Sequence, residues 1–385
     1  MEWIVSDDIQ SETWRRLHEF ANIDLTNEYL VVRHGSPKSS SDRRNYRKQA
    51  EQARVCVLQA KEYFDAARSS SLFTAPNHLY YGLVALTSLQ MLVLGDGECS
   101  LDFRRKKPEN GQHGLSFGTG CDAAAATQGV KLLEYTYSEV QRFGHFMSWY
   151  SILPREISIY GLHKHDLLPG SFKDFGVCGT YSTAMPEKMI GRKKGALSLL
   201  TMLPDLAQDF RRYGIPLAAA RSTQEMRRTQ NSPWRNVWTF HQQFMPERFE
   251  DLLNRFYVSA RFADCLIPHV DPNGNLWGVE VIDPDLGEMN FYSPESRDTM
   301  DHETISYAEP IDTHELVDAF MVSFQLSMLS RYYTDLWVGC IESHCKAAQL
   351  IARAVETLLN KCPILALSML TPKGVLISTH RAPWK

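Results

Sequence analysis

A charged amphipathic segment followed at once by a segment that is apolar on nearly every side is the feature that most constrains this fold. In residues 42–67, apolar side chains recur at three- and four-residue intervals among Arg, Lys, Glu and Gln, which predicts an amphipathic helix. Residues 79–94 are apolar nearly all round, which is typical of a buried helix. Thr74 and Pro76 suit the start of that second helix, and Gly95 suits its end. The sequence therefore predicts a helical hairpin over residues 42–94 whose second arm lies in a core.

At 385 residues the chain is longer than one hydrophobic core usually serves. We expect an N-terminal helical region over 1–125, which holds the hairpin and a polar loop, and a mixed α/β middle region over 126–300. The clearest strand pair is 276–292, where two apolar-rich stretches flank a DPDLG turn. A C-terminal helical region over 301–385 is expected to pack on the N-terminal helices, its long helices ending at Pro363. The predicted fold class is α+β, mainly helical.

Charge and cysteine usage indicate which partners and which cellular compartment to expect. A net charge of −4 and a pI near 6.4 give no strong nucleic-acid signal. The eight cysteines include no CxxC pair, so free thiols in a reducing compartment are expected. The N-terminus carries no basic-then-apolar signal pattern, and segment 79–94 is too short and interrupted for a membrane span. We expect a cytoplasmic protein that is not an integral membrane protein.

The common catalytic and cofactor motifs are missing from the sequence. It contains neither familiar glycine-rich phosphate loop, nor GxSxG, nor HExxH. His163 and His165 have metal-ligand character, but no second ligand pair has matching spacing. Cys340, His344 and Cys345 indicate a core cysteine beside a boundary histidine rather than ligands. No cofactor and no metal site is predicted.

One catalytic alternative stays open. In ribonucleases of the HEPN class an arginine precedes a histidine by four to six positions, and the two side chains stabilise phosphate charge and move a proton. Two segments have this spacing, Arg235 with His241 and Arg297 with His302. A chain this rich in arginine and histidine produces such spacings by chance. The sequence therefore favours a binding role and leaves enzyme activity open.

The stretch RSSSLFTAPNHLYYG, at the corner of the hairpin, contains the other candidate residues. Tyr80 and Tyr81 are expected to pack the hairpin with their rings and to form hydrogen bonds through their hydroxyls. Arg68 and His78, together with His113 further along, are the polar side chains that suit a binding site. A basic run in the polar loop is either a solvated face or part of a binding surface: Arg104, Arg105, Lys106 and Lys107.

Five sequence blocks follow one another along the chain. They are AARSSSLFTAPNHLYYGLVALTSLQ, HGLSFG, EVQRFGHFMSWYSIL, LSLLTMLPDLAQDFRRYG, and FQLSMLSRYYTDLWVGCIES followed by CPILALSML. In this order they resemble the YaaC-like proteins, a bacterial family, over roughly residues 45–370.

This resemblance implies a HEPN-like, dimerising helical core and supplies no catalytic residues. Some YaaC-like proteins are encoded beside a partner gene in anti-phage systems, where they sense early infection. The resemblance thus implies a sensor or adaptor that recognises a phage-derived component or an early infection structure. It would recruit an effector protein encoded by a neighbouring gene. The alternatives are a HEPN-like ribonuclease activated by a partner and a housekeeping interaction protein.

Overall fold

The protein is described by a computed structural model, and every structural statement below concerns the residues that it describes. These are residues 2–95, 100–102, 106, 111–165, 172–215, 219–227, 235–240, 266–270, 276–282, 303–307, 313–371 and 375–378. The chain divides into two compact units, which are treated separately. Unit 1 comprises Met1–Pro154, Ala184–Leu200 and Glu315–Ile377, and unit 2 comprises Arg155–Thr183, Thr201–His314 and Ser378–Lys385.

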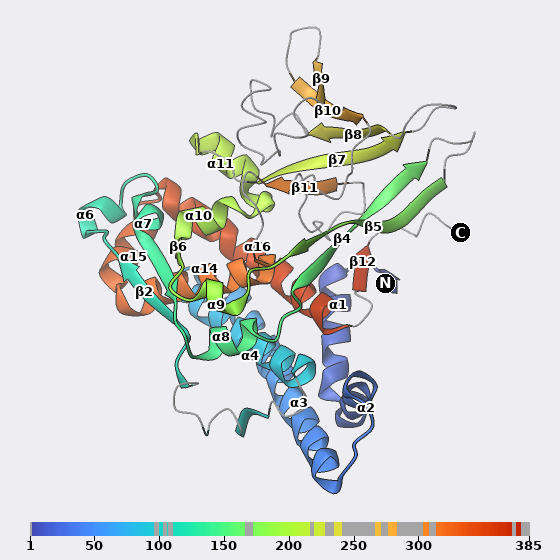
Figure 1. Ribbon diagram of the computed structural model, residues 1–385. Coiled ribbons are helices and arrows are strands. Elements are labelled where there is room, and N and C mark those ends of the chain that lie inside the picture. The colour runs from blue at the N-terminus through green and yellow to red at the C-terminus, as the bar shows by residue number, and fades with distance from the viewer. Residues whose placement is uncertain are drawn as a thin grey trace. The chain divides into compact units, whose positions relative to one another are not determined.

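The helical hairpin predicted from the sequence lies in unit 1 and is confirmed (Figure 1). It consists of α3 (Ser40–Ser69) and α4 (Ala75–Leu94). At the start of α3 the Ser39 hydroxyl accepts from the Asp42 N–H at 3.1 Å, and the Asp42 carboxylate accepts from the Ser39 N–H at 2.9 Å. This reciprocal cap satisfies two N–H groups that a helix start otherwise leaves free.

Gly82 allows the two arms of the hairpin to approach closely. A Cβ at this position would lie 2.6 Å from the ring of Phe64 on α3, which is itself fully buried against Trp14. The glycine after the two tyrosines is therefore explained by helix packing, since any side chain there would displace a core ring.

Two C-terminal helices, α14 (Glu315–Tyr332) and α16 (Lys346–Leu370), pack against α4 in unit 1. Gln90 of α4 joins three helices, because its amide donates to the Ala366 carbonyl at 3.2 Å and accepts from the Trp149 indole at 2.7 Å. A buried ion pair between Glu315 and Lys361 links α14 to α16. Buried polar groups thus fix how the apolar helices meet.

The end of the last long helix differs from the sequence-based expectation. We expected a stop at Pro363, but α16 continues through this residue to Leu370. Proline has no N–H, so the Leu359 carbonyl loses its helical donor. Arg68 Nη2 donates to that carbonyl at 3.0 Å, and Gln10 Nε2 donates to the Asn360 carbonyl at 2.6 Å. A side chain from α3 therefore replaces the backbone donor that Pro363 lacks, and Gln10 of α1 binds the next carbonyl of α16.

Unit 1 also contains a small antiparallel sheet with the order β2-β3-β6 and a β1–β12 pair. Gln325 ties α14 to this sheet by donating to Ser138 at 2.7 Å and to the Lys194 carbonyl at 3.0 Å. The other elements of unit 1, two of which end one residue beyond it, are β1 (Glu2–Val5), α1 (Ile9–Leu17), η1 (His18–Ala21), α2 (Ile23–His34), β2 (Leu115–Thr119), α6 (Ala123–Ala126), α7 (Lys131–Glu134), β3 (Thr136–Val140), α8 (His145–Tyr150), α9 (Pro186–Met189), β6 (Lys193–Gly195), α10 (Ala196–Thr201), α15 (Thr334–Glu342) and β12 (Val375–Ser378).

Unit 2 is built mainly from strands. An antiparallel five-stranded sheet has the order β11-β7-β8-β10-β9, and β4 pairs with β5. The first strand of the pair predicted over 276–292 is present as β10. Residues 283–292, which would form the second strand, lie outside the described part. The elements are β4 (Glu156–His165), β5 (Phe172–Ser182), η3 (Pro204–Leu206), α11 (Ala207–Tyr213), β7 (Ala219–Arg227), β8 (Arg235–Phe240), β9 (Leu266–Val270), β10 (Leu276–Ile282) and β11 (Glu303–Tyr307).

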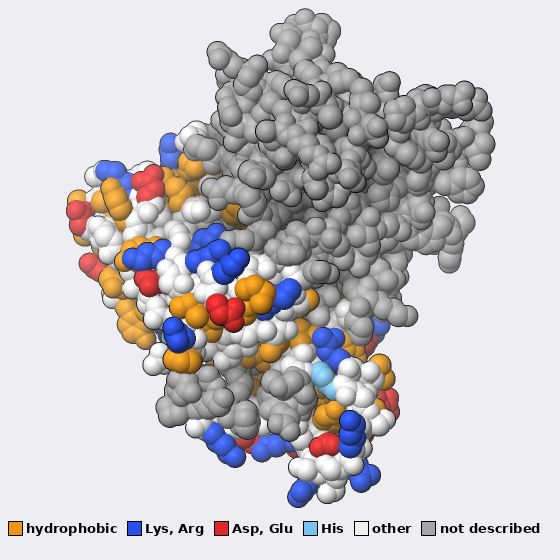
Figure 2. Space-filling view, viewed as in Figure 1, with side chains coloured by type: hydrophobic (Ala, Val, Ile, Leu, Met, Phe, Trp, Pro, Cys, Tyr) orange, Lys and Arg blue, Asp and Glu red, His pale blue; other side chains and the backbone are white. Residues whose placement is uncertain are grey.

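The α+β, mainly helical fold class is confirmed for the described residues. The expected boundaries at residues 125 and 300 do not coincide with those of the two units, because β3 and β6 belong to the helical unit 1 and unit 2 extends to His314. On the face shown in Figure 2, lysine and arginine side chains of the described part lie between hydrophobic ones rather than in a single basic field.

Candidate functional site

Tyr80 on α4 and His113, two residues before β2, form a hydrogen-bonded pair in unit 1. The Tyr80 side chain is fully buried, and its hydroxyl lies 2.8 Å from His113 Nδ1. Phe320 and Phe324 of α14 pack edge-on against the Tyr80 ring, with centroid separations of 5.5 and 5.6 Å. His113 is exposed on its other side. The pair therefore connects the helical core to the surface.

The protonation state of this pair follows from its surroundings. Burial raises the pKa of Tyr80, so the phenol stays protonated and its O–H donates a hydrogen bond to His113. Burial, followed by the positive charge of Arg331, lowers the pKa of His113 from 6.5. The imidazole is thus neutral at pH 7, and we assign its proton to Nε2 from this hydrogen-bond network.

Two glycines place His113 where it meets Tyr80. Gly114 and Gly144 have φ angles of +81° and +113°, which favour glycine. A Cβ on Gly144 would lie 2.4 Å from the Gly114 nitrogen, and the Phe146 N–H donates to the His113 carbonyl at 3.0 Å. The HGLSFG and EVQRFGHF stretches thus cross at their glycines, and this close crossing holds the backbone of His113.

A second pair of a hydroxyl and an imidazole, Thr87 and His145, lies two turns along the same face of α4. The Thr87 hydroxyl donates to the Leu83 carbonyl at 2.8 Å and lies 2.7 Å from His145 Nε2. His145 stacks on Phe320 at 5.9 Å, the same ring that contacts Tyr80. This pair is less exposed than His113, and it supports the packing of α8 on α4.

Arg331, in the last turn of α14, supplies the positive charge beside the first pair. Its Nη1 donates to the Tyr81 hydroxyl at 2.8 Å, and its Nε donates to the Ser327 carbonyl at 3.2 Å. The guanidinium lies 5.4 Å from the Tyr81 ring centroid and 5.0 Å from that of Tyr332, within the range of cation–π attraction. Tyr332 is 65 % exposed, so this aromatic and cationic surface is open to solvent.

Asn77 of α4 links this helix to α14 by hydrogen bonds. Its Oδ1 accepts from the Ser327 and Ser330 hydroxyls at 3.1 and 2.9 Å. We call the group formed by Asn77, Tyr80, Tyr81, His113 and Arg331 the α4–α14 cluster. His78, a predicted binding residue, is the half-buried neighbour of Asn77 on α4.

The α4–α14 cluster combines an imidazole N–H, a guanidinium and tyrosine rings at one surface. The imidazole N–H and the guanidinium donate hydrogen bonds, and the guanidinium attracts negative charge, so the cluster suits an acidic partner group. No group of three or more His, Cys, Asp and Glu side chains able to hold a metal ion occurs within the described residues.

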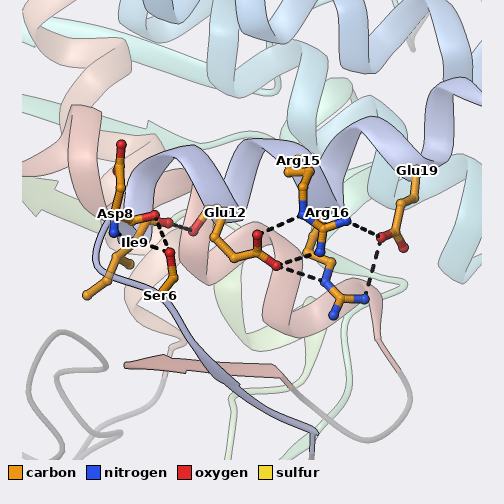
Figure 3. A network of polar contacts seen from close by, with 8 residues as sticks. Ser6, Asp8, Ile9, Glu12, Arg15, Arg16 and Glu19 are labelled. Atoms are coloured by element: carbon orange, nitrogen blue, oxygen red, sulfur yellow. Dashed lines mark hydrogen bonds and ion pairs between the residues drawn. The ribbon is translucent and has the colours of Figure 1, made fainter. Parts of the chain in front are cut away.

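Arg68 was predicted as a binding residue, and its contacts here are structural. Besides the Leu359 carbonyl, its Nη2 donates to Asn360 Oδ1 at 2.9 Å and lies 3.4 Å from Gln10 Oε1. Gln10 belongs to α1, and Glu12, Arg15 and Arg16 of the same helix form a network of ion pairs with Glu19 of η1 (Figure 3). Arg68 and His113 therefore do not share one site.

Most other predicted residues fall outside the described part of the chain. Lys106 is an exposed turn residue, whereas Arg104, Arg105 and Lys107 lie outside. Arg235 begins strand β8 of unit 2. His241, Arg297 and His302 lie outside the described residues, so both arginine–histidine pairs stay predictions.

Sequence reasoning missed Arg331 and assigned Tyr80 and Tyr81 a structural role, with packed rings and bonded hydroxyls. The available signal was an arginine followed by two tyrosines at the end of an otherwise buried, apolar helix. A groove apart from the α4–α14 cluster has a volume of about 170 Å³ and is lined by Arg16, Glu19, Phe20, Leu25, Thr26, Tyr29, Leu367 and Thr371.

Comparison with known proteins adds one match. A family model described as "YaaC-like Protein" matches residues 18–370. No curated protein and no solved structure matches the chain. Among the helices of the described part, none has the length and apolar character needed to cross a membrane.

Proposed function

This chain belongs to the YaaC-like family, and from this premise we propose that it is a sensor or adaptor of bacterial anti-phage defence. In this proposal it works in the cytoplasm, recognises a component of early phage infection and recruits an effector protein encoded by a neighbouring gene. The single observation that carries the proposal is the family match over residues 18–370.

The α4–α14 cluster supports a binding role for unit 1. Arginine and tyrosine side chains contribute much of the binding energy at protein interfaces. Here Arg331 lies between the rings of Tyr81 and Tyr332, and His113 is exposed beside it. A fully buried aromatic layer stands behind these residues, so the surface is held rigidly and loses little entropy on binding. We propose that an acidic segment of a partner protein binds to this surface.

The experiment is phage plating on a susceptible host that carries this gene alone, its neighbouring gene alone, or both, with large-genome phages in the panel. The proposal predicts protection only when both genes are present. Absence of protection across the whole panel contradicts it and favours a housekeeping interaction protein.

A HEPN-like ribonuclease is the second candidate. It is supported by the α3–α4 hairpin with α14 and α16 packed against α4, which suits a HEPN-like helical core. Protection by this gene alone would favour it. Unchanged activity and toxicity in both His241→Ala and His302→Ala would then exclude the two arginine–histidine pairs as its catalytic residues.

A further inference from the structure

Two cysteines meet at the turn between α15 and α16, away from the α4–α14 cluster. Cys340 lies in the last turn of α15, and Cys345 is the residue that precedes α16. Their sulfur atoms are 3.6 Å apart. A disulfide has a sulfur–sulfur bond of about 2 Å, so a small side-chain movement brings the two atoms to bonding distance.

The turn itself brings the two thiols together. His344 has a φ of +52°, which turns the chain sharply between the two helices. The Ser343 hydroxyl donates to the Cys340 carbonyl at 2.7 Å and accepts from the Cys345 N–H at 3.3 Å. The spacing of five residues differs from a CxxC motif, which is why the sequence did not indicate a pair.

The surroundings make the two thiols unequal. Cys340 is fully buried, and burial together with the nearby Cys345 raises its pKa. Cys345 is half-buried. Burial acts to raise its pKa, but the Ser343 hydroxyl, the Ala348 N–H and the Cys340 thiol outweigh this effect and lower it. A thiol of lowered pKa at the start of a long helix, beside a thiol of raised pKa, is the arrangement of a reactive cysteine with a resolving partner.

We propose that Cys340 and Cys345 form a peroxide-reactive dithiol, in which Cys345 is the attacking sulfur and Cys340 resolves it to a disulfide. The Cys345 thiolate attacks a peroxide oxygen, the O–O bond breaks, and the leaving oxygen takes up a proton. Cys345 is then a sulfenic acid. The Cys340 sulfur attacks the Cys345 sulfur, the S–S bond forms, and the hydroxyl leaves as water with the Cys340 proton. Two electrons pass from the dithiol to the peroxide.

Oxidation would cross-link α15 to the start of α16 at a junction with earlier parts of unit 1. The Ala347 N–H donates to the Gly129 carbonyl at 2.8 Å, and Cys345 Sγ lies 3.9 Å from the Ala126 carbonyl. The site is therefore a candidate for oxidative modification of unit 1. It stands independently of the proposed role in phage defence.

Peptide mapping of the full chain tests this proposal directly. Trypsin releases residues 332–346 as one peptide that contains both cysteines and no other. After treatment with a limiting amount of hydrogen peroxide, this peptide should lose two hydrogen atoms and resist alkylation by iodoacetamide. If both thiols remain alkylated after peroxide treatment, or if either forms a disulfide with Cys121, the proposal is overturned.

Three variants separate the roles. Cys340→Ser should accumulate a sulfenic acid on Cys345 that dimedone captures, and Cys345→Ser should show neither product. Cys121→Ser is the matched control, because Cys121 is also half-buried but burial and the charge of Asp122 raise its pKa. This control should form the disulfide as the wild-type protein does. Dimedone capture on Cys340 instead of Cys345 would contradict the assigned order of attack.

Discussion

Arg68 and Arg331 each lie one residue before the end of a long helix and donate hydrogen bonds to a neighbouring helix. Arg68 donates to a backbone carbonyl that Pro363 leaves without its helical donor. Arg331 donates to a tyrosine hydroxyl and lies between two aromatic rings at an open surface. Similar positions therefore have different consequences: Arg68 replaces a missing backbone donor of α16, whereas Arg331 lies with exposed Tyr332 at an open surface.

The largest expected effect concerns the backbone beneath the α4–α14 cluster. Gly144→Ala places a Cβ against the backbone of Gly114 and strains a φ of +113°, so we expect a loss of about 3 kcal/mol or more in the free energy of unfolding. Urea denaturation measures it. Gly129→Ala is the control, because its φ is +53° and nothing lies within 4 Å of the added Cβ. That variant should lose only about 1 kcal/mol, and equal losses would refute the role of the crossing.

The next largest effect tests the structural role of Arg68. Arg68→Ala removes the donor to the Leu359 carbonyl and to Asn360, so stability should fall by about 2 kcal/mol. Arg54→Ala, an exposed arginine on the same helix, should change stability by less than about 0.5 kcal/mol. Urea midpoints of the two variants measured side by side give the answer.

A smaller effect isolates the reason for the Arg68 contact. Pro363→Ala restores an N–H that can donate to the Leu359 carbonyl. In this background Arg68→Ala should cost about 1 kcal/mol less than in the wild-type protein. A double-mutant cycle measures the difference. Full additivity would show that the proline is not why the arginine is needed.

The smallest effect is a pH dependence. Folding lowers the pKa of His113 from 6.5, so the unfolded chain binds a proton there more readily than the folded chain. Stability from this group is complete above pH 6.5 and declines as the pH falls towards the lower folded pKa. Urea midpoints at about pH 7.5 and about pH 5.5 should therefore differ less in His113→Gln than in the wild-type protein. An unchanged difference would place the titrating group elsewhere.

The parts of this fold that depend on local pattern could be predicted from the sequence. The recurrence of apolar residues among charged ones identified α3, the nearly continuous apolar character of residues 79–94 identified α4, and Gly95 marked the end of α4. The prediction that the helix ends at Pro363 was wrong, because the carbonyl that the proline leaves without a donor is bonded by Arg68, which lies 291 residues from it in the chain.

The candidate site could be predicted only in part from the sequence, because it too depends on contacts between distant segments. His113 was identified, but its partner Tyr80 was assigned to packing, and Arg331 was missed. Their proximity results from the packing of α14 on α4 and from the crossing of two glycines, and neither is encoded in a short stretch of sequence. The thiol pair at Cys340 and Cys345 likewise depends on the turn at His344.

The most direct test of the binding role is affinity capture from phage-infected cells with the wild-type chain, Arg331→Gln and Arg54→Ala, each checked for folding by circular dichroism. We predict that the wild-type chain and Arg54→Ala retain a phage component or the product of the neighbouring gene. Arg331→Gln should retain about tenfold less of it. Equal capture by a folded Arg331→Gln variant would contradict the assignment of the α4–α14 cluster as the binding surface.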